Sequence, residues 1–222
     1  MQLFVKVIDH LYLASINAIT DNNIIDNNID LIINVCQYKN KYQGVVPNIQ
    51  ISLHDDVYQN LTDILTEPIN QVSVKYQQRH PLNNSELNIL TLINNMISEK
   101  KNIVIHCFCG ISRSVTLILA YLIKYCEFNL IKAISHIRNI NPLANPNVGF
   151  IHQLIYYDVL WNKKTTITPW FYIDMSYSEY QNFIIKMSSL NYYFMKIKSV
   201  ISINDLLNIL LDPIQFANCR YI

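Results

Sequence analysis

The sequence has almost no net charge: 17 Lys and Arg residues oppose 16 Asp and Glu residues, which leaves +1 over 222 residues. Without a strong field of either sign, the chain is not expected to attract nucleic acid or an anionic membrane. Only 15% of the residues are charged, whereas 51% are hydrophobic, which is enough to bury one sizeable core. Any anion-binding site must therefore be built locally.

The sequence also lacks an unbroken apolar run of the roughly 18 residues that a membrane-spanning helix needs. The apolar stretch near its start, MQLFVKVIDHLYLAS, contains Lys6, Asp9 and His10, so we expect no secretory signal there. The cysteines are odd in number and irregularly spaced, at positions 36, 107, 109, 126 and 219, which excludes a small disulfide-stapled scaffold. We expect a soluble protein of a reducing compartment, cytoplasmic or possibly nuclear.

Short apolar segments alternate with helical patterns over the first 160 residues. Strands are predicted at 3–13 (one or two strands at a sheet edge), 30–36, 48–54 and 102–107. A short helix is predicted within 16–29, and further helices at 85–100 (with Ser85 as the N-cap), 114–126, 130–140 and 147–161. The segment 57–84 is predicted as loop or irregular helix. This alternation predicts an α/β domain with a central, mostly parallel sheet flanked by helices.

The texture of the sequence changes at about residue 163, where the polar segment KKTTITP begins. We therefore expect one domain over 1–163 and a C-terminal extension, mostly helical, over 164–222. The Tyr and Phe residues of 170–194 favour core packing of an added helix over a partner surface.

The segment IHCFCGISRSV, at 105–115, places a Cys and an Arg six residues apart between a predicted strand and a predicted helix. In that context successive backbone N–H groups turn inward and the helix N-terminus adds positive charge, so the loop forms a cradle for a tetrahedral dianion. Gly110 supplies the tight backbone that the loop requires. Cys107, at the floor of the cradle, is then a nucleophile in its thiolate form, and Arg113 forks two N–H donors onto a phosphoryl group.

Attack of sulfur on phosphorus expels an alkoxide or phenoxide, which needs a proton from an acid on the opposite side of the phosphate. Asp55 or Asp56, on the loop after a predicted strand, can supply it. The same carboxylate then takes a proton from the water that hydrolyses the thiophosphoryl intermediate. Ser114, or alternatively Ser112, is expected to hydrogen-bond the departing thiolate.

Other residues around the loop allow further interpretations. His106 is expected to support the loop, with its side chain pointing away from Cys107 along an extended strand. Cys109 or Cys36 can be imagined to trap an oxidised Cys107 as a disulfide, although the restrictive geometry of that bond favours a filler role for Cys109. A zinc site on His106, Cys107 and Cys109 lacks a further well-spaced ligand pair, so we expect neither a metal nor a cofactor.

The segment HCFCGISRS resembles the His-Cys-x5-Arg-Ser loop of dual-specificity protein phosphatases, of the protein tyrosine phosphatase superfamily. Five further segments resemble the family in the same order: IDHLYLAS, LIINV, ISLHDD, SVTLILAYLIKY and NPNVGFIHQLIYYDVL. The resemblance covers about the first 160 residues and is nearest to the small atypical members, which lack a kinase-docking domain. The interval between Asp55 and Cys107 is longer than in compact members, with the extra residues expected within 66–84.

The resemblance implies a protein-tyrosine-phosphatase-like fold and places Asp55, rather than Asp56, at the acid position. It also implies that Asn147, in the family's Pro-Asn-x-Gly-Phe turn, supports the loop. The implied substrate-binding residues are those of the loop itself, namely Phe108, Cys109, Gly110, Ile111, Ser112 and Arg113.

The loop carries no Lys or Arg between Cys107 and Arg113, which argues against inositol phosphates and RNA 5′-triphosphates as substrates. We therefore expect a phosphorylated protein as substrate, and the resemblance implies phosphoserine and phosphothreonine as well as phosphotyrosine. Two alternatives stay open: a phosphoprotein-binding module that has lost turnover, and a phosphatase for a non-protein phosphate such as an RNA 5′-phosphate or a phosphoinositide. The sequence assigns no oligomeric state.

Overall fold

The computed structural model describes residues 2–66 and 88–162 of the chain. Its strands are β1 (Phe4–Ile8), β2 (Leu11–Ser15), β3 (Ile29–Asn34), β4 (Asn48–Gln50) and β5 (Asn102–Cys107). Its α-helices are α1 (Asp21–Asp26), α2 (Thr62–Thr66), α4 (Ile89–Ser98), α5 (Arg113–Tyr125), α6 (Leu130–Ile140) and α7 (Val148–Asn162), and a short 3₁₀ helix covers Ile16–Ala18. The predictions for 163–222 and most of those for 66–84 lie outside the described residues.

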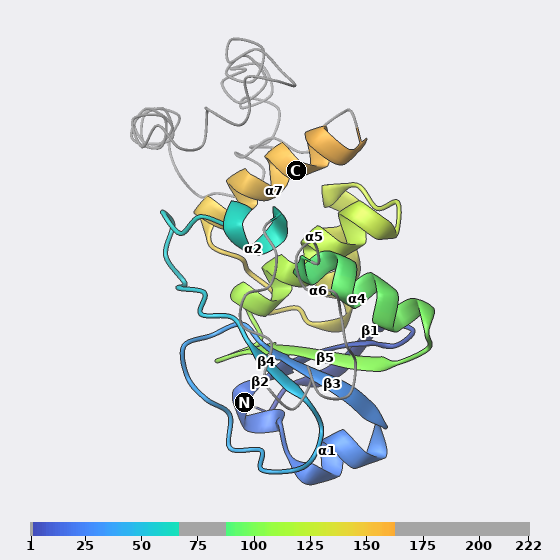
Figure 1. The fold of residues 1–222 in the computed structure, drawn as a ribbon. Helices are drawn as coiled ribbons and strands as arrows, with labels where there is room; N and C mark the ends of the chain where they lie inside the picture. The colour runs from blue at the N-terminus through green and yellow to red at the C-terminus, as the bar shows by residue number, and fades with distance from the viewer. Residues whose placement is uncertain (1, 67–87, 163–222) are drawn as a thin grey trace.

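The five strands form one sheet in the order β1-β2-β5-β3-β4. All neighbouring pairs are parallel except β1 and β2, which are antiparallel. The prediction of a central, mostly parallel sheet flanked by helices is confirmed (Figure 1). β1 lies at an edge as predicted, but β2 pairs with β5 as well as with β1 and is therefore not an edge strand.

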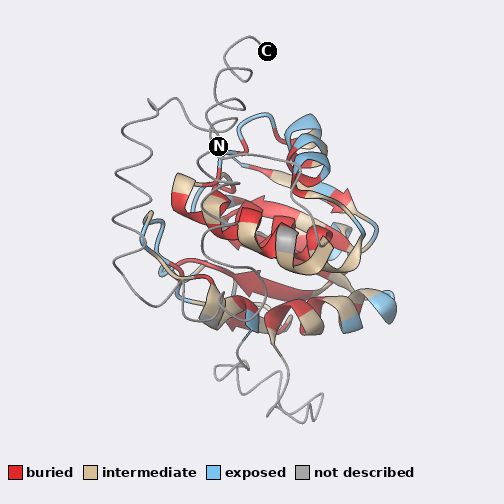
Figure 2. Ribbon diagram, turned by 90° about the horizontal axis from the view of Figure 1, so that it is seen from above, coloured by how far each residue is buried: buried red, intermediate tan, exposed pale blue. Residues whose placement is uncertain are grey.

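The two faces of the sheet are covered unequally (Figure 1). Among the α-helices of the described residues, α1 covers one face by itself, and there Ile24 joins a small buried cluster with Ile32 and Val104. Helices α2, α4, α5, α6 and α7 lie on the other face and enclose the main core. Buried residues concentrate in the sheet and in the helices packed on it (Figure 2), and ten consecutive residues of α5 are buried. Helix α5, which follows the loop at 108–112, is therefore the central helix of the domain.

Two predicted boundaries are corrected by the structure. Helix α4 begins at Ile89 and is capped by Asn88, whose side chain accepts a hydrogen bond from the Thr91 amide, so Ser85 is not its N-cap. Asn is as good a cap as Ser, and the sequence pattern does not choose between them. The predicted strand 48–54 is also shorter, because β4 ends at Gln50.

Strand β5 and helix α5 frame the loop as the sequence predicts. β5 ends at Cys107, and α5 begins at Arg113, which leaves five residues to make the turn. The carboxyl ends of parallel strands meet at one edge of a sheet, where such loops form sites. The loop after β3 and the acidic loop after β4 lie at this same edge.

Candidate active site

The loop between β5 and α5 closes around the sulfur of Cys107. Two donors point at Sγ: the backbone N–H of Gly110 and the hydroxyl of Ser114, each at 3.2 Å. The side chain of Cys107 is almost fully buried. Two hydrogen bonds to one sulfur at the N-terminal end of a helix stabilise negative charge there.

Gly110 is the residue that lets the loop curl. Its φ is +74°, a conformation that residues with a side chain rarely adopt. A Cβ at this position would lie 2.7 Å from Cδ2 of Leu3 and 3.1 Å from the carbonyl oxygen of Ala14. Asn141, at the end of α6, donates its side-chain amide to the Gly110 carbonyl over 3.0 Å. The curl is therefore fixed by its own backbone, by the sheet beneath it and by α6.

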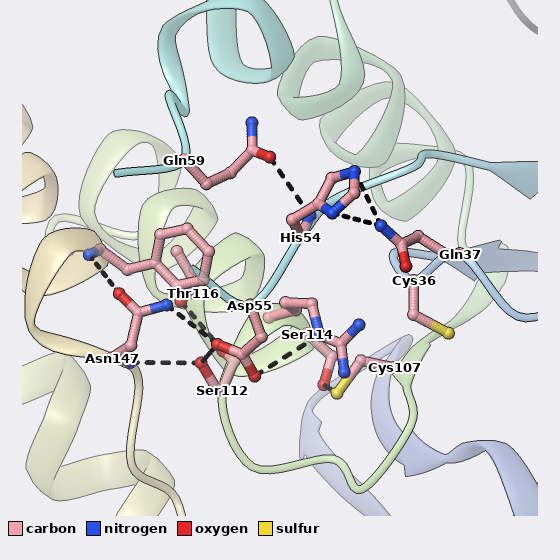
Figure 3. A network of polar contacts seen from close by, with 12 residues as sticks. Cys36, Gln37, His54, Asp55, Gln59, Cys107, Ser112, Ser114, Thr116 and Asn147 are labelled. Atoms are coloured by element: carbon pink, nitrogen blue, oxygen red, sulfur yellow. Dashed lines mark hydrogen bonds and ion pairs between the residues drawn. The ribbon is translucent and has the colours of Figure 1, made fainter. Parts of the chain in front are cut away.

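Asp55 lies over the start of α5, where three side chains contact its carboxylate (Figure 3). Oδ1 accepts hydrogen bonds from Ser112 Oγ at 2.6 Å and from Asn147 Nδ2 at 2.9 Å. Oδ2 lies 3.5 Å from Nε of Arg113. One carboxylate oxygen is thus anchored, and the other faces the guanidinium of the loop.

Asp56, the alternative acid, is occupied elsewhere. Its Oδ1 accepts a hydrogen bond from the Tyr58 amide at 2.7 Å, which closes a local turn. Of the two carboxylates, it is Asp55 that the structure brings to the loop. The two serines are also distinguished, because Ser114 contacts the Cys107 sulfur whereas Ser112 contacts Asp55.

Asn147, predicted to support the loop, is the joint between three elements. Its backbone N–H donates to Ser112 Oγ at 3.2 Å, and its Oδ1 accepts from the Phe150 amide at 3.0 Å. The residue therefore caps the start of α7 while its side-chain amide holds Asp55.

Gln153 and Gly149 hold the acidic loop and were missed by the sequence reasoning. The side chain of Gln153, fully buried in α7, accepts from the Leu61 amide at 2.6 Å and donates to the Gln59 carbonyl at 2.8 Å. A Cβ at Gly149 would lie 1.8 Å from the carbonyl oxygen of Val57. Helix α7 thus contacts the loop that carries Asp55 both by hydrogen bonds and by backbone approach. Because α7 also contains His152 and Asp158, no sequence signal singled out Gln153.

The side chain of His106 lies on the opposite face of β5 from that of Cys107. Cys107 belongs to the main core with Ile105, whereas Val104 belongs to the smaller cluster, and strand alternation puts His106 on that second side. Its Nε2 pairs with Asn40 Nδ2 at 3.0 Å, and its Nδ1 lies 3.3 Å from the Cys107 carbonyl oxygen. Burial lowers the pKa of His106 to about 4, so the ring is neutral near pH 7. A neutral ring that accepts at Nε2 carries its proton on Nδ1, facing the Cys107 carbonyl.

The remaining loop residues and cysteines differ in exposure. Phe108 and Cys109 are exposed, while Ile111 is partly buried and its carbonyl accepts from the Asn145 amide at 2.9 Å. Cys36 is buried, and burial raises the pKa of its thiol. The four cysteines of the described ranges, at 36, 107, 109 and 126, are free thiols. Within these ranges, His, Cys, Asp and Glu residues form no group of three that could hold a metal ion, and no helix is long and apolar enough to cross a membrane.

A thiol cradled by backbone and hydroxyl donors between a parallel strand and an Arg-led helix defines the class of cysteine-dependent phosphatases. The family model of the dual specificity phosphatase catalytic domain matches residues 11–159, more than half of the chain. The chain therefore belongs to the dual-specificity phosphatase family, and it is a protein phosphatase.

The relatives span very different shares of their own lengths. Protein 123R of Invertebrate iridescent virus 6 is 27% identical over 154 residues, which is 69% of this chain and 90% of the relative. Mouse dual specificity protein phosphatase 18 is also 27% identical over 154 residues, which is 69% of this chain and 78% of the relative. Dual specificity protein phosphatase 1 of Arabidopsis thaliana is 47% identical over 53 residues, only 24% of this chain and 27% of that protein.

Among solved structures, human DUSP28 aligns with a TM-score of 0.57 at 22% identity, covering 72% of this chain and 95% of that one. At this identity the likeness concerns the fold, and it confirms the predicted protein-tyrosine-phosphatase-like architecture.

Proposed function

We propose that the chain hydrolyses phosphate monoesters of proteins in two steps through a cysteinyl-phosphate on Cys107. The observation that carries this proposal is the pair of hydrogen bonds to Sγ from Gly110 and Ser114, each at 3.2 Å. Donors that point at sulfur stabilise the negative charge that it carries as the attacking and departing group. The thiolate attacks phosphorus, a sulfur–phosphorus bond forms, and the bond from phosphorus to the leaving oxygen breaks.

Arg113 holds the phosphoryl group in this proposal. It is the first residue of α5, so its guanidinium and the helix N-terminus act on the same side of the phosphate. A guanidinium presents two parallel N–H donors, which match two phosphoryl oxygens and follow them as the group flattens during transfer. In the structure its Nε faces Asp55 Oδ2 at 3.5 Å, so an arriving phosphate replaces a carboxylate oxygen as its partner.

Asp55 is the proposed general acid, and its two oxygens have different tasks. Oδ1 is held by Ser112 and Asn147, which fixes the position of the carboxyl group. Oδ2 carries the proton to the leaving oxygen, since it faces the loop in which the phosphate binds.

In the second step the ionised Asp55 takes a proton from water, and the water oxygen attacks phosphorus. The sulfur–phosphorus bond breaks, and the electron pair returns to Sγ. The Ser114 hydroxyl, already directed at Sγ, stabilises the departing thiolate.

For the substrate, we propose phosphotyrosine together with phosphoserine and phosphothreonine in proteins. The loop has no Lys or Arg between Cys107 and Arg113, which supports a single phosphate over polyphosphorylated lipids or RNA ends. The near-zero net charge likewise supports a function without nucleic acid or membrane partners. Free thiols among the described cysteines support a reducing, cytoplasmic or nuclear compartment.

The match to residues 11–159 supports a phosphatase domain over 1–163, with 164–222 as an added C-terminal segment. We assign no role to that segment.

The test is turnover of p-nitrophenyl phosphate and of phosphotyrosine and phosphothreonine peptides by the purified chain, without added metal. We expect hydrolysis that persists with chelator and is abolished in Cys107→Ser. Phosphopeptide binding without hydrolysis by the wild-type protein would instead identify a binding module. Hydrolysis of an RNA 5′-phosphate or a phosphoinositide with none on phosphopeptides would contradict the protein substrate.

A further inference from the structure

Two exposed aromatic rings stand together at the rim of the site. Phe108 follows the nucleophile directly, and its side chain is 49% exposed; Tyr38, which follows β3, is 58% exposed. Their ring centroids lie 5.5 Å apart at an interplanar angle of 54°. The two rings are therefore in contact with each other, and about half of the surface of each residue stays exposed to solvent.

Hydrogen bonds hold the backbone of both aromatic residues in place. The Phe108 carbonyl accepts from the Ile16 amide at 3.1 Å. The Tyr38 carbonyl accepts from the side-chain amide of Asn34, the last residue of β3, at 2.8 Å. Strands β3 and β5 are parallel neighbours, so the two rings project from the same sheet edge as the phosphate loop. Their position is set by the fold rather than by a free loop.

The segment that carries Tyr38 borders the acid as well as the nucleophile. Gln37, its neighbour, hydrogen-bonds the ring of His54, which directly precedes Asp55 (Figure 3). Tyr38 itself touches Phe108, next to Cys107. The aromatic pair therefore adjoins both the segment that carries Cys107 and the segment that carries Asp55.

We propose that Phe108 and Tyr38 form an aromatic wall that contacts the ring of a phosphotyrosine and makes the enzyme prefer phosphotyrosine over phosphothreonine. In phosphotyrosine the ring is bonded directly to the phosphoryl oxygen. When the phosphate lies in the loop, the ring therefore begins next to Phe108, the residue that follows Cys107. Phosphothreonine presents only a short aliphatic stem there, which covers little aromatic surface. Ring–ring contacts favour tilted or offset geometries, and the tilted pair offers an edge and a face.

This inference rests on the proposed function. Its test is the ratio of kcat/KM on a phosphotyrosine peptide to kcat/KM on a phosphothreonine peptide. Two peptides of identical sequence, with phosphotyrosine or phosphothreonine at one position, are assayed for kcat/KM on the wild type, Phe108→Leu and Tyr38→Leu. Leaving-group differences between the peptides are the same for every variant and cancel in the comparison. We expect the ratio of phosphotyrosine to phosphothreonine kcat/KM to fall about two- to tenfold in each Leu variant. Tyr38→Phe, which keeps the ring, should retain the wild-type ratio.

Ile25→Ala is the matched control, because it removes another exposed apolar side chain from α1, on the far face of the sheet. It should leave both activities unchanged. The two test positions lie on different segments, so poor folding of one variant leaves the other as a test. A ratio within experimental error of wild type in the Leu variants overturns the aromatic wall while the phosphatase remains. Absence of turnover on both peptides by the wild type overturns the proposed function itself.

Discussion

The side-chain amide of Asn147 donates a hydrogen bond to Oδ1 of Asp55 over 2.9 Å, although 92 residues separate them. Ser112 Oγ donates to the same oxygen and in turn accepts from the Asn147 backbone N–H. Asp55, the loop between β5 and α5, and the start of α7 are thereby joined at one point. In the proposed mechanism this joint sets where the proton is delivered.

Replacing Asn147 by Ala should lower kcat on a phosphothreonine peptide about tenfold. A hydrogen bond to a charged group contributes about 1.5–3 kcal/mol, and only part of that energy affects the barrier to proton transfer. The loss on p-nitrophenyl phosphate should be smaller, because that leaving group needs less help from an acid. Steady-state kinetics on both substrates measure the difference. Equal losses on the two would show that Asn147 acts through folding alone.

Asp55→Asn should lower kcat on phosphothreonine peptides by about 10²–10⁴, the usual contribution of a positioned general acid. The amide keeps the size of the carboxyl group but has no acidic proton. Asp56→Asn is the matched control and should change kcat less than threefold, because its carboxylate only closes the turn to Tyr58. A larger loss for Asp56→Asn would move the acid to that residue.

Gly149→Ala should be destabilising although it lies in the first turn of a helix, where Ala is normally favoured over Gly by about 1 kcal/mol. The added Cβ would lie 1.8 Å from the Val57 carbonyl oxygen, so the acidic loop or α7 must move. Overpacking of this kind costs about 1–3 kcal/mol. We expect a lower midpoint in urea unfolding and a reduced kcat. A raised midpoint would mean that the close approach is not present.

His106 should make the folded state lose stability on acidification. Burial lowers its pKa in the folded protein to about 4, against 6.5 as the ordinary value. Between these values the unfolded chain binds a proton that the folded protein does not, so the free energy of unfolding falls as pH falls through this window and levels off below pH 4. The contribution is on the order of 3 kcal/mol.

Urea unfolding from pH 7 to pH 4 on the wild type and on His106→Gln measures this contribution. The variant retains an acceptor for Asn40 and lacks the titration of His106, whereas buried His152, whose pKa is lowered to about 3, is present in both proteins. The stability of the variant should therefore fall less steeply than that of the wild type. Parallel pH profiles for the two proteins would count against a buried neutral ring at this position.

The sequence predicted the part of the site that is local. A Cys and an Arg six residues apart can form a cradle only between a strand and a helix, and both elements have clear apolar patterns, so Cys107 and Arg113 could be placed without a structure. The contacts around Asp55 are different, because Asn147 and Gln153 reach the acidic loop across a long interval in the chain. The choice of Asp55 over Asp56 and the role of Asn147 came from the family resemblance alone, and Gln153 was not predicted. No periodicity encodes which polar side chain of a helix meets which loop.

The predicted end of the strand at 48–54 was wrong for a related reason. The acidic segment was predicted as a strand up to residue 54, but only Asn48–Gln50 has a neighbouring strand with which to pair. The segment after Gln50 leaves the sheet to approach the phosphate loop. Alternation in a sequence describes the side chains of a strand and says nothing of the partner that the strand needs.

The central claim, that Cys107 carries the phosphoryl group, is tested most directly by trapping the intermediate. The chain is mixed with a phosphotyrosine peptide, quenched in acid within one turnover and digested, and the fragment that contains Cys107 is analysed by mass spectrometry. Asp55→Asn should raise the amount of intermediate if hydrolysis of the cysteinyl-phosphate is slowed more than its formation. A phosphoryl group on the Cys107 fragment, absent in Cys107→Ser, is the predicted result. Turnover with no phosphoryl group on that fragment, or turnover that survives in Cys107→Ser, would contradict the account.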